Sequence, residues 1–474
     1  MFVLASVSVR ANVTLSGLFA DHMVLQRELP VSVYGTAEPG EKVAVAFAGQ
    51  KKSVTAGSNG QWSVKLDPMK ASKVPAAMTV SGKNEVIVQD VAIGDVWVCS
   101  GQSNMEFVLS QGNRPDDIKA AEFPLIRQFK VPHNRIATTC EEVKSAWVVC
   151  SPQSAASFSA VGYYFARKVQ KETGVPIGLI DSSWSGTPIE PWIAPVGKEM
   201  VPEPLREIVK LPFDGPADWS LLYNGMIHPL IKFPIKGVLW YQGESNAIFN
   251  KDDNREESYH QKMRGLVAGW RKVWNIGEFP FYYVQLANFQ NPNDNPEGGE
   301  PWARICTSQL RSLSIPNTGM AVAIDLADVG NPSDIHPKNK LDVGERLAAW
   351  ALAKDYGKKS LVYSGPLYKR MKIEGGKIRI GFDSVGSGLI VATKKGYDPM
   401  VKDPQGKLKR FAIAGDDKKW FWADAVIDRN TVLVSSPSVP KPVAVRYAFA
   451  ANPDGCNLYN NDGFPASPFR TDIW

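Results

Sequence analysis

Residues 91–106 read Val91-Ala92-Ile93-Gly94-Asp95-Val96-Trp97-Val98-Cys99-Ser100-Gly101-Gln102-Ser103-Asn104-Met105-Glu106. The first half is largely apolar, which predicts a buried strand. The second half places Gly101 two positions before Ser103. A serine just beyond a buried strand, on a glycine-containing turn, exposes its hydroxyl at the sheet edge and directs free backbone N–H groups toward the group that it attacks. Ser103 is therefore our candidate nucleophile.

A serine nucleophile working near neutral pH needs a base, and histidine is the usual one. The chain has five histidines: His22, His133, His228, His260 and His336. His336 follows a strand-like run at 320–326 and precedes a helical pattern at 341–348, so it is predicted in a loop at the end of a strand. Active sites of open α/β sheets gather there. We select His336 over His228, whose apolar neighbours indicate a packed, hydrogen-bonded side chain.

Two further strings end predicted strands with polar groups. Residues 177–190 contain Gly186, whose backbone N–H can come close to a developing oxyanion because glycine has no side chain. Residues 237–247 form a buried strand that ends in Gln242-Gly243-Glu244-Ser245-Asn246. Each string alone is also typical of an ordinary strand-to-loop junction.

Gly101-Gln102-Ser103-Asn104-Met105 resembles block I of the SGNH (GDSL-like) hydrolases, in the form used by sialate O-acetylesterases and related carbohydrate esterases. The four strings also follow the chain order of the SGNH blocks. An α/β-hydrolase elbow is not supported, because Met105 stands where Gly-x-Ser-x-Gly has its second glycine. The resemblance implies an α/β fold with a three-layer α/β/α SGNH-hydrolase domain around a parallel sheet.

The resemblance also implies a role for each block. Ser103 matches the nucleophile, and its own N–H would serve the oxyanion hole. Gly186 matches the block II donor, and the side-chain amide of Gln242 in block III would be a third donor. His336 matches the base, which accepts the Ser103 proton during formation of an acyl-enzyme.

Two residues are candidates for the carboxylate that orients His336. Asp334 lies two positions before the histidine, as in the Asp-Ile-His-Pro form of sialate O-acetylesterases, whereas related xylan-type esterases use the block III glutamate, here Glu244. The sequence departs from the relatives at Cys306-Thr307-Ser308-Gln309, where they often read Arg-Glu-Ala-Gln. Loss of an arginine that holds an acidic sugar counts against sialate specificity.

Composition points to a globular enzyme that works without metal or cofactor. The 474 residues carry 54 basic and 48 acidic side chains, a net charge of +6. Basic clusters such as Lys407-Leu408-Lys409-Arg410 are short, so we expect no nucleic-acid partner. No segment approaches the roughly 20 apolar residues of a membrane span. We find no metal-ligand spacing and no phosphate-binding glycine string, so we expect no metal and no cofactor.

At about 150 residues per domain, the length predicts three domains. Short alternating runs predict an N-terminal β-sandwich-like domain at 1–92, and strands that alternate with helical patterns predict the catalytic α/β domain at 93–357. Strand patterns return in a C-terminal β-rich domain at 358–474. We see no internal repeat, and the sequence leaves the oligomeric state open.

The predicted cellular location rests mostly on the family resemblance. Residues 1–11 are apolar but short for a signal peptide, so they are either the remnant of one or a first strand. Five cysteines are an odd number, and Cys140 and Cys150 are either a disulfide or free thiols. We expect a periplasmic or secreted protein.

Sugar recognition is predicted from aromatic and amide side chains. Trp184 and Trp192 lie in loop-like sequence and offer rings for a sugar, and Asn246 is a third candidate contact. We predict an esterase that removes O-acetyl groups from sialic acids. The alternatives are an esterase for acetylated xylan or another neutral glycan, and a non-catalytic glycan-binding protein. A glycosidase using Glu244 and Asp334 would leave Ser103 without a role.

Overall fold

The computed structural model describes residues 12–250, 255–328 and 330–474. The predicted signal-peptide remnant at 1–11 lies outside these residues. The centre of the molecule is a sheet in which six strands run parallel, in the order β9-β11-β8-β12-β13-β14, with β10 antiparallel at one edge. Its strands are β8 (Glu85–Gly101), β9 (Phe123–Lys130), β10 (Trp147–Cys150), β11 (Ile177–Ser183), β12 (Gly237–Tyr241), β13 (Phe281–Gln285) and β14 (Thr318–Val322).

Strand order reverses around β8. After β8, the chain builds β9 and β11 on one side, then crosses to build β12, β13 and β14 on the other. In open α/β sheets, such a reversal leaves a crevice at the carboxyl ends of the strands, where ligands bind. Gly101, the last residue of β8, therefore sits at the position that the topology favours for a site.

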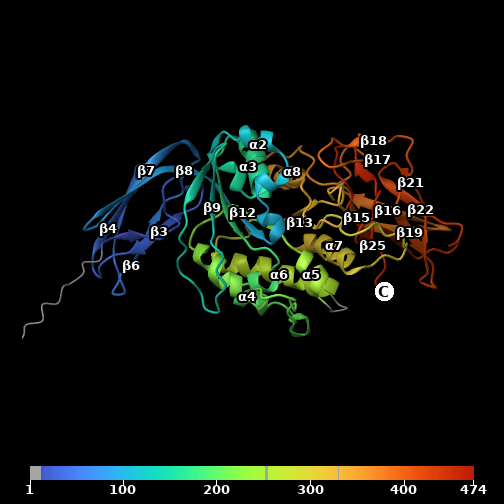
Figure 1. Cartoon of the computed structure of the whole chain (residues 1–474), viewed down its shortest axis with the longest axis horizontal. Coiled ribbons are helices and arrows are strands. Elements are labelled where there is room, and N and C mark those ends of the chain that lie inside the picture. The colour runs from blue at the N-terminus through green and yellow to red at the C-terminus, as the bar shows by residue number, and fades with distance from the viewer. Residues whose placement is uncertain (1–11, 251–254, 329) are drawn as a thin grey trace, which may run out of the picture.

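Helices lie on both sides of this sheet (Figure 1). α3 packs against α8 on one side, while α6 packs against α4 and α7 on the other. The helices are α1 (Ser103–Glu106), α2 (Pro115–Lys119), α3 (Ala160–Thr173), α4 (Pro195–Lys198), α5 (Glu244–Phe249), α6 (Arg255–Trp274), α7 (Pro301–Arg311) and α8 (Lys340–Lys354). The predicted α/β class is confirmed as a mixed α/β fold.

β8 also belongs to the N-terminal β region, since its first half pairs with β7 and β2. A second sheet there has the order β1-β3-β6. Buried and exposed residues alternate along β4 and β6, which is the pattern of strands with one face in a core. The strands are β1 (Thr14–Leu15), β2 (Val24–Gln26), β3 (Val31–Thr36), β4 (Lys42–Phe47), β5 (Gln50–Thr55), β6 (Gln61–Leu66) and β7 (Ser72–Ser81).

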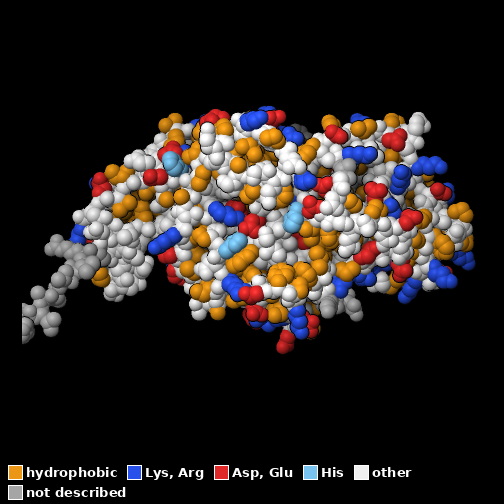
Figure 2. All heavy atoms as spheres, in the orientation of Figure 1, with side chains coloured by type: hydrophobic (Ala, Val, Ile, Leu, Met, Phe, Trp, Pro, Cys, Tyr) orange, Lys and Arg blue, Asp and Glu red, His pale blue; other side chains and the backbone are white. Residues whose placement is uncertain are grey.

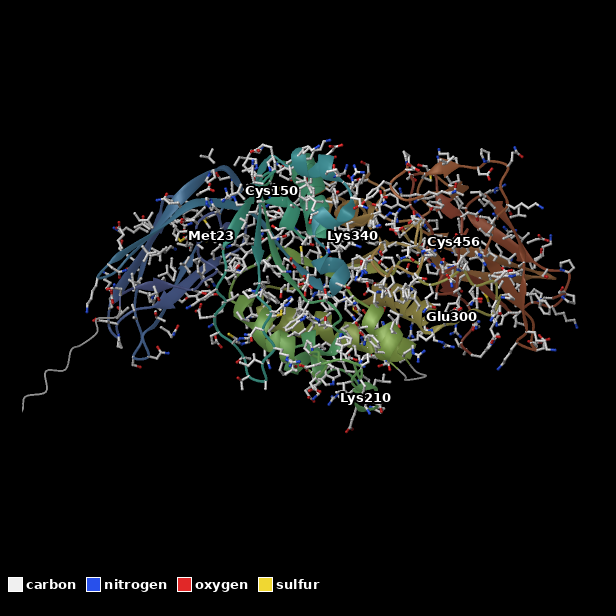
Figure 3. All side chains as sticks on the ribbon, in the orientation of Figure 1. Met23, Cys150, Lys210, Glu300, Lys340 and Cys456 are labelled. Atoms are coloured by element: carbon white, nitrogen blue, oxygen red, sulfur yellow. The ribbon has the colours of Figure 1, made fainter. Side chains whose placement is uncertain are left out.

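Strands return after α8 and form three small sheets at the opposite end of the molecule (Figure 1). They are β15 (Leu367–Glu374), β16 (Lys377–Asp383), β17 (Leu389–Thr393), β18 (Val401–Lys402), β19 (Phe411–Ala414), β20 (Trp420–Trp422), β21 (Asp424–Asp428), β22 (Thr431–Ser435), β23 (Ala444–Tyr447), β24 (Leu458–Asn460) and β25 (Phe469–Arg470). Figure 3 labels Lys340, the first residue of α8, near the middle of the molecule, where the helices approach these strands.

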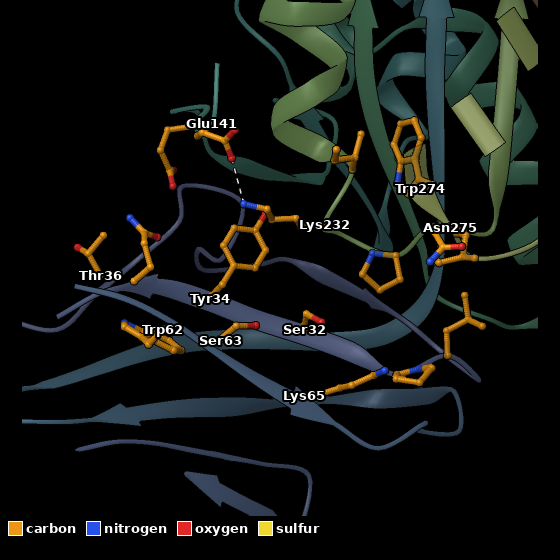
Figure 4. A pocket seen from close by; sticks show the side chains of 17 residues that line it. Ser32, Tyr34, Thr36, Trp62, Ser63, Lys65, Glu141, Lys232, Trp274 and Asn275 are labelled. Atoms are coloured by element: carbon orange, nitrogen blue, oxygen red, sulfur yellow. Dashed lines mark hydrogen bonds and ion pairs between the residues drawn. The ribbon is translucent and has the colours of Figure 1, made fainter. Parts of the chain in front are cut away.

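A groove of about 960 Å³ separates the outer face of β3 and β6 from the catalytic region (Figure 4). Tyr34 and Ser63 line its sheet side, and an ion pair between Lys232 and Glu141 (3.0 Å) crosses its rim. None of the residues predicted for catalysis lines it. Cys140 and Cys150 are free thiols. No helix among the residues described is both long and apolar enough to cross a bilayer.

Candidate active site

Three of the four predicted blocks meet at the carboxyl end of β8. Gly101 pairs with Ser183 of β11 on one side and with Tyr241 of β12 on the other. Ser103 follows as the first residue of α1, and its side chain is half-buried at the sheet edge. The first N–H groups of a helix have no partner within the helix, and the Ser103 N–H makes no hydrogen bond to any residue that the structure describes.

Gly101 is required by this junction. Its φ is +133°, a conformation that side chains disfavour, and a Cβ would collide with the Tyr241 carbonyl. We expect Gly101→Ala to lower the free energy of unfolding by about 2–4 kcal/mol, because strain and overlap add. Thermal unfolding measures this loss. The matched variant Gly277→Ala has a positive φ (+92°) but open space around its Cβ, so a smaller loss is expected there.

Asn104 joins the nucleophile turn to the histidine loop. Its Nδ2 donates to the carbonyl of Ile335 (2.9 Å) and to Oε1 of Glu244 (2.5 Å). Its Oδ1 accepts from Nζ of Lys340 (2.6 Å), which also donates to the carbonyl of Pro337. Asn104 follows Ser103, and Ile335 precedes His336, so this network joins the chain neighbours of the predicted nucleophile and base.

Of the two candidate carboxylates, Asp334 is the one beside His336. Its Oδ1 lies 3.6 Å from His336 Nδ1 and accepts the His336 backbone N–H at 2.9 Å. Glu244 is 1% exposed, and its side chain accepts a hydrogen bond from Asn104 rather than from the imidazole. The geometry favours Asp334 as the residue that orients His336.

Burial and charge shift three pKa values around the base. Burial lowers the pKa of Lys340 to about 7, although Glu244 and Asp334 attract its proton. Burial raises the pKa of Glu244 despite the Asn104 hydrogen bond and the nearby ammonium. Burial and the Lys340 charge lower the pKa of His336, with Asp334 acting in the opposite direction. His336 is therefore neutral, and able to accept a proton, over a wider pH range than a free imidazole.

Gly186 lies on a turn held by Glu106. Glu106 Oε2 accepts both the backbone N–H (2.8 Å) and the hydroxyl (2.6 Å) of Ser185, directly before Gly186. Gly186 has φ +74°, and its N–H makes no hydrogen bond to any described residue. Burial would raise the pKa of Glu106, but hydrogen bonds from His133 and Ser185 and the charge of Lys130 hold it at about 2. An ionised carboxylate thus fixes this turn.

The remaining predicted residues lie deeper than the sequence suggested. Gln242 is fully buried, and its Nε2 donates to Asn246 (2.8 Å), Gln102 (3.2 Å) and the Thr187 carbonyl (3.3 Å). Asn246 is 1% exposed, and its amide donates to the Glu190 carboxylate (3.2 Å).

Trp192 is also fully buried, with its ring edge-to-face against Trp240 and its Nε1 donating to Thr187 (3.0 Å). Trp184 alone of the two candidate tryptophans is partly exposed. The side chains of Gln242, Asn246 and Trp192 are thus all buried and hydrogen-bonded to other residues of the protein.

Comparison with known proteins places this geometry in a family. Residues 93–353 match the family model "Carbohydrate esterase, sialic acid-specific acetylesterase". The chain belongs to this family of carbohydrate esterases. Its members are carboxylic ester hydrolases, and this chain is one of them.

The similarity extends over the whole esterase. It is 31% identical to the mouse sialate O-acetylesterase, with all of this chain and 97% of the mouse protein covered. It is 32% identical to the human sialate O-acetylesterase, over 94% of this chain and 90% of that one. A carbohydrate acetylesterase from Xanthomonas citri superposes with a TM-score of 0.87 at 41% identity, covering 98% of this chain and all of the other.

Three side chains near the site, those of Glu106, Lys340 and His133, were not predicted as site residues from the sequence. Glu106 is one helical turn beyond Ser103, so helical spacing could have pointed to it. Lys340 begins α8, four positions after His336 in the loop, and no helical spacing relates the two. His133 comes from a separate loop, and nothing in its local sequence signals its approach to Glu106 (2.8 Å).

Proposed function

We propose that this esterase removes O-acetyl groups from sugars with Ser103 as nucleophile and His336 as base, on an SGNH-type three-layer domain. The observation that carries the proposal is the hydrogen bond from Asn104 to the Ile335 carbonyl (2.9 Å), which joins the neighbours of the two residues. The site also lies at the strand-order reversal where α/β sheets bind ligands.

His336 takes the proton of Ser103 as the hydroxyl oxygen attacks the acetyl carbonyl. The N–H groups of Ser103 and Gly186 stabilise the oxyanion of the tetrahedral intermediate. His336 then protonates the departing sugar oxygen, leaving an acetyl-serine. Water attacks that ester with the same imidazole as base and releases acetate. Asp334 holds the imidazole and favours its protonated form in each transition state.

O-acetylated sialic acid is the first candidate substrate. The matched family model and the mouse and human relatives carry sialate acetylesterase activity in their names. A periplasmic or secreted location, where such glycans occur, is part of this proposal.

An uncharged acetylated glycan is the second candidate, because two arginines that could meet a sialate carboxylate already pair with carboxylates of the protein. Arg127 is 2% exposed and pairs with Asp90 (3.0 Å). Arg135 pairs with Asp214 through two hydrogen bonds (2.9 and 3.0 Å). Cys306, at the position where relatives often have arginine, is buried and supplies no charge.

A paired assay separates these candidates. Acetate release from 9-O-acetylated sialic acid is compared with release from acetylated xylan at equal acetyl concentration. Preference for the first supports the sialate proposal, and preference for the second supports the neutral glycan. If neither substrate loses its acetyl group but one of the two glycans binds, the result supports a glycan-binding protein instead.

The charge of Lys340 should contribute, after burial, to the position of the acid limb of the pH profile. As a base, His336 must be neutral, so kcat/KM falls as the pH drops through its pKa. Because Lys340 lowers that pKa, we expect Lys340→Met to move the acid limb of kcat/KM toward higher pH. The control is Lys338→Met, whose ammonium pairs instead with Asp328 (3.3 Å). An unmoved acid limb in Lys340→Met would contradict the assignment of His336.

A further inference from the structure

His133 and Trp184 form a stacked pair beside the nucleophile turn. Their ring centroids are 4.2 Å apart and their planes differ by 4°. One side of Trp184 packs against the hydrophobic core, while the His133 side chain is 39% exposed. Figure 2 shows histidine side chains reaching the surface near the middle of the molecule, close to hydrophobic ones. The pair therefore offers a partly exposed aromatic surface beside the nucleophile turn.

This face is tied to both halves of the reaction centre. The backbone N–H of Trp184 donates to the Gly101 carbonyl (3.0 Å), two residues before Ser103. His133 Nε2 lies 2.8 Å from Glu106 Oε1, and Glu106 shares the short helix α1 with Ser103. The same carboxylate holds Ser185 before Gly186. A molecule resting on the stacked pair lies next to the groups that would attack its ester.

The hydrogen bonds fix the imidazole and its tautomer. Nε2 faces two acceptors, Glu106 Oε1 and the Ser183 carbonyl (3.1 Å), so this nitrogen carries a proton. Nδ1 makes no hydrogen bond to the residues that the structure describes, and it remains able to bond a ligand hydroxyl. An exposed ring that is held rigid and keeps one unused polar atom is suited to binding rather than to stability.

The charged residues around the His133–Trp184 pair favour a ligand that has no charge where it contacts the pair. Lys130 lies 2.9 Å from Asp181 and 3.7 Å from Glu106, so two carboxylates surround the ammonium. Arg135, two residues beyond His133, is held by Asp214. Both cations are thus paired with carboxylates of the protein itself. The apolar C–H face of a sugar ring fits an aromatic platform, and ring hydroxyls fit Nδ1.

We propose that His133 and Trp184 are the subsite that holds the pyranose ring of the acetylated sugar during attack by Ser103. This rests on the proposed function and adds to it the residue that recognises the leaving group. His133 contacts the ring directly, Trp184 supports it from beneath, and Glu106 is a positioning residue.

The test compares sugar acetates with an acetate that has no ring. Wild type, His133→Ala and His133→Phe are assayed on an acetylated xylo-oligosaccharide, on 9-O-acetylated sialic acid and on vinyl acetate. We expect His133→Ala to lower kcat/KM roughly ten-fold for the sugar acetate that wild type prefers, through KM, and to change vinyl acetate hydrolysis less than about two-fold. His133→Phe should recover part of the loss, because it restores stacking but not the polar atom.

His22→Ala is the matched control, since His22 is an exposed histidine that also pairs with a carboxylate, Asp90 at 2.6 Å. It should leave all three rates unchanged. Equal losses on sugar and vinyl acetates in both His133 variants would overturn the subsite, as would unchanged sugar kinetics. A wild type that hydrolyses vinyl acetate but neither sugar would also overturn it. Failure to hydrolyse any acetate, or full activity of Ser103→Ala, would refute the proposed function itself.

Discussion

Replacing Ser103 by alanine is expected to reduce acetate release by about 10⁴-fold or more, and His336→Ala should have a comparable effect. Without the hydroxyl no acyl-enzyme can form, and without the imidazole the hydroxyl keeps its proton. Because the two act as one unit, the double variant should be little worse than either single variant. Steady-state kinetics on an acetylated sugar measure all three.

Ser110→Ala is the matched control, because Ser110 is exposed seven residues beyond the nucleophile. It should retain full activity. Mass spectrometry of rapidly quenched reactions should detect an acetyl adduct on wild type and none on Ser103→Ala. Additive losses in the double variant would mean that Ser103 and His336 do not cooperate in one step.

The sequence was sufficient to predict which strand ends would meet. Parallel strands bring their carboxyl ends to one edge, so Ser103, Gly186 and the Gln242 string were expected together. In the structure, Ser183 and Tyr241 flank Gly101 in register. The mixed α/β class followed in the same way, from strands alternating with helical patterns.

Burial could not be predicted from the same strings. The family resemblance made Gln242 a candidate oxyanion donor, and loop-like sequence made Trp192 a candidate sugar contact, yet both side chains are buried. Whether such a side chain faces the cleft depends on packing of distant segments, here the donation from Tyr259 of α6 to Gln242 (2.9 Å). Likewise, the approach of His133 to Glu106 joins a loop to the short helix α1, and no local pattern links the two.

The carboxylate question left by the sequence can be decided with two amide substitutions. We expect Asp334→Asn to lower kcat/KM about 10²-fold, since the amide removes the charge that stabilises the protonated imidazole. The effect should be smaller than for a buried triad aspartate, because the Asp334 side chain is 32% exposed. The amide oxygen can still accept the His336 backbone N–H, so the loop should keep its shape.

Glu244→Gln is the matched variant, and we expect it to lower kcat/KM by less than about five-fold. Its amide oxygen can still accept from Asn104 Nδ2, and the structure shows no hydrogen bond between Glu244 and His336. Thermal unfolding of both variants separates a catalytic loss from a folding loss. A large loss in Glu244→Gln with near-normal activity in Asp334→Asn would assign the orienting role to Glu244. We expect the larger loss of kcat/KM in Asp334→Asn, because Asp334 is the carboxylate beside the imidazole. Its Oδ1 lies 3.6 Å from Nδ1 of His336.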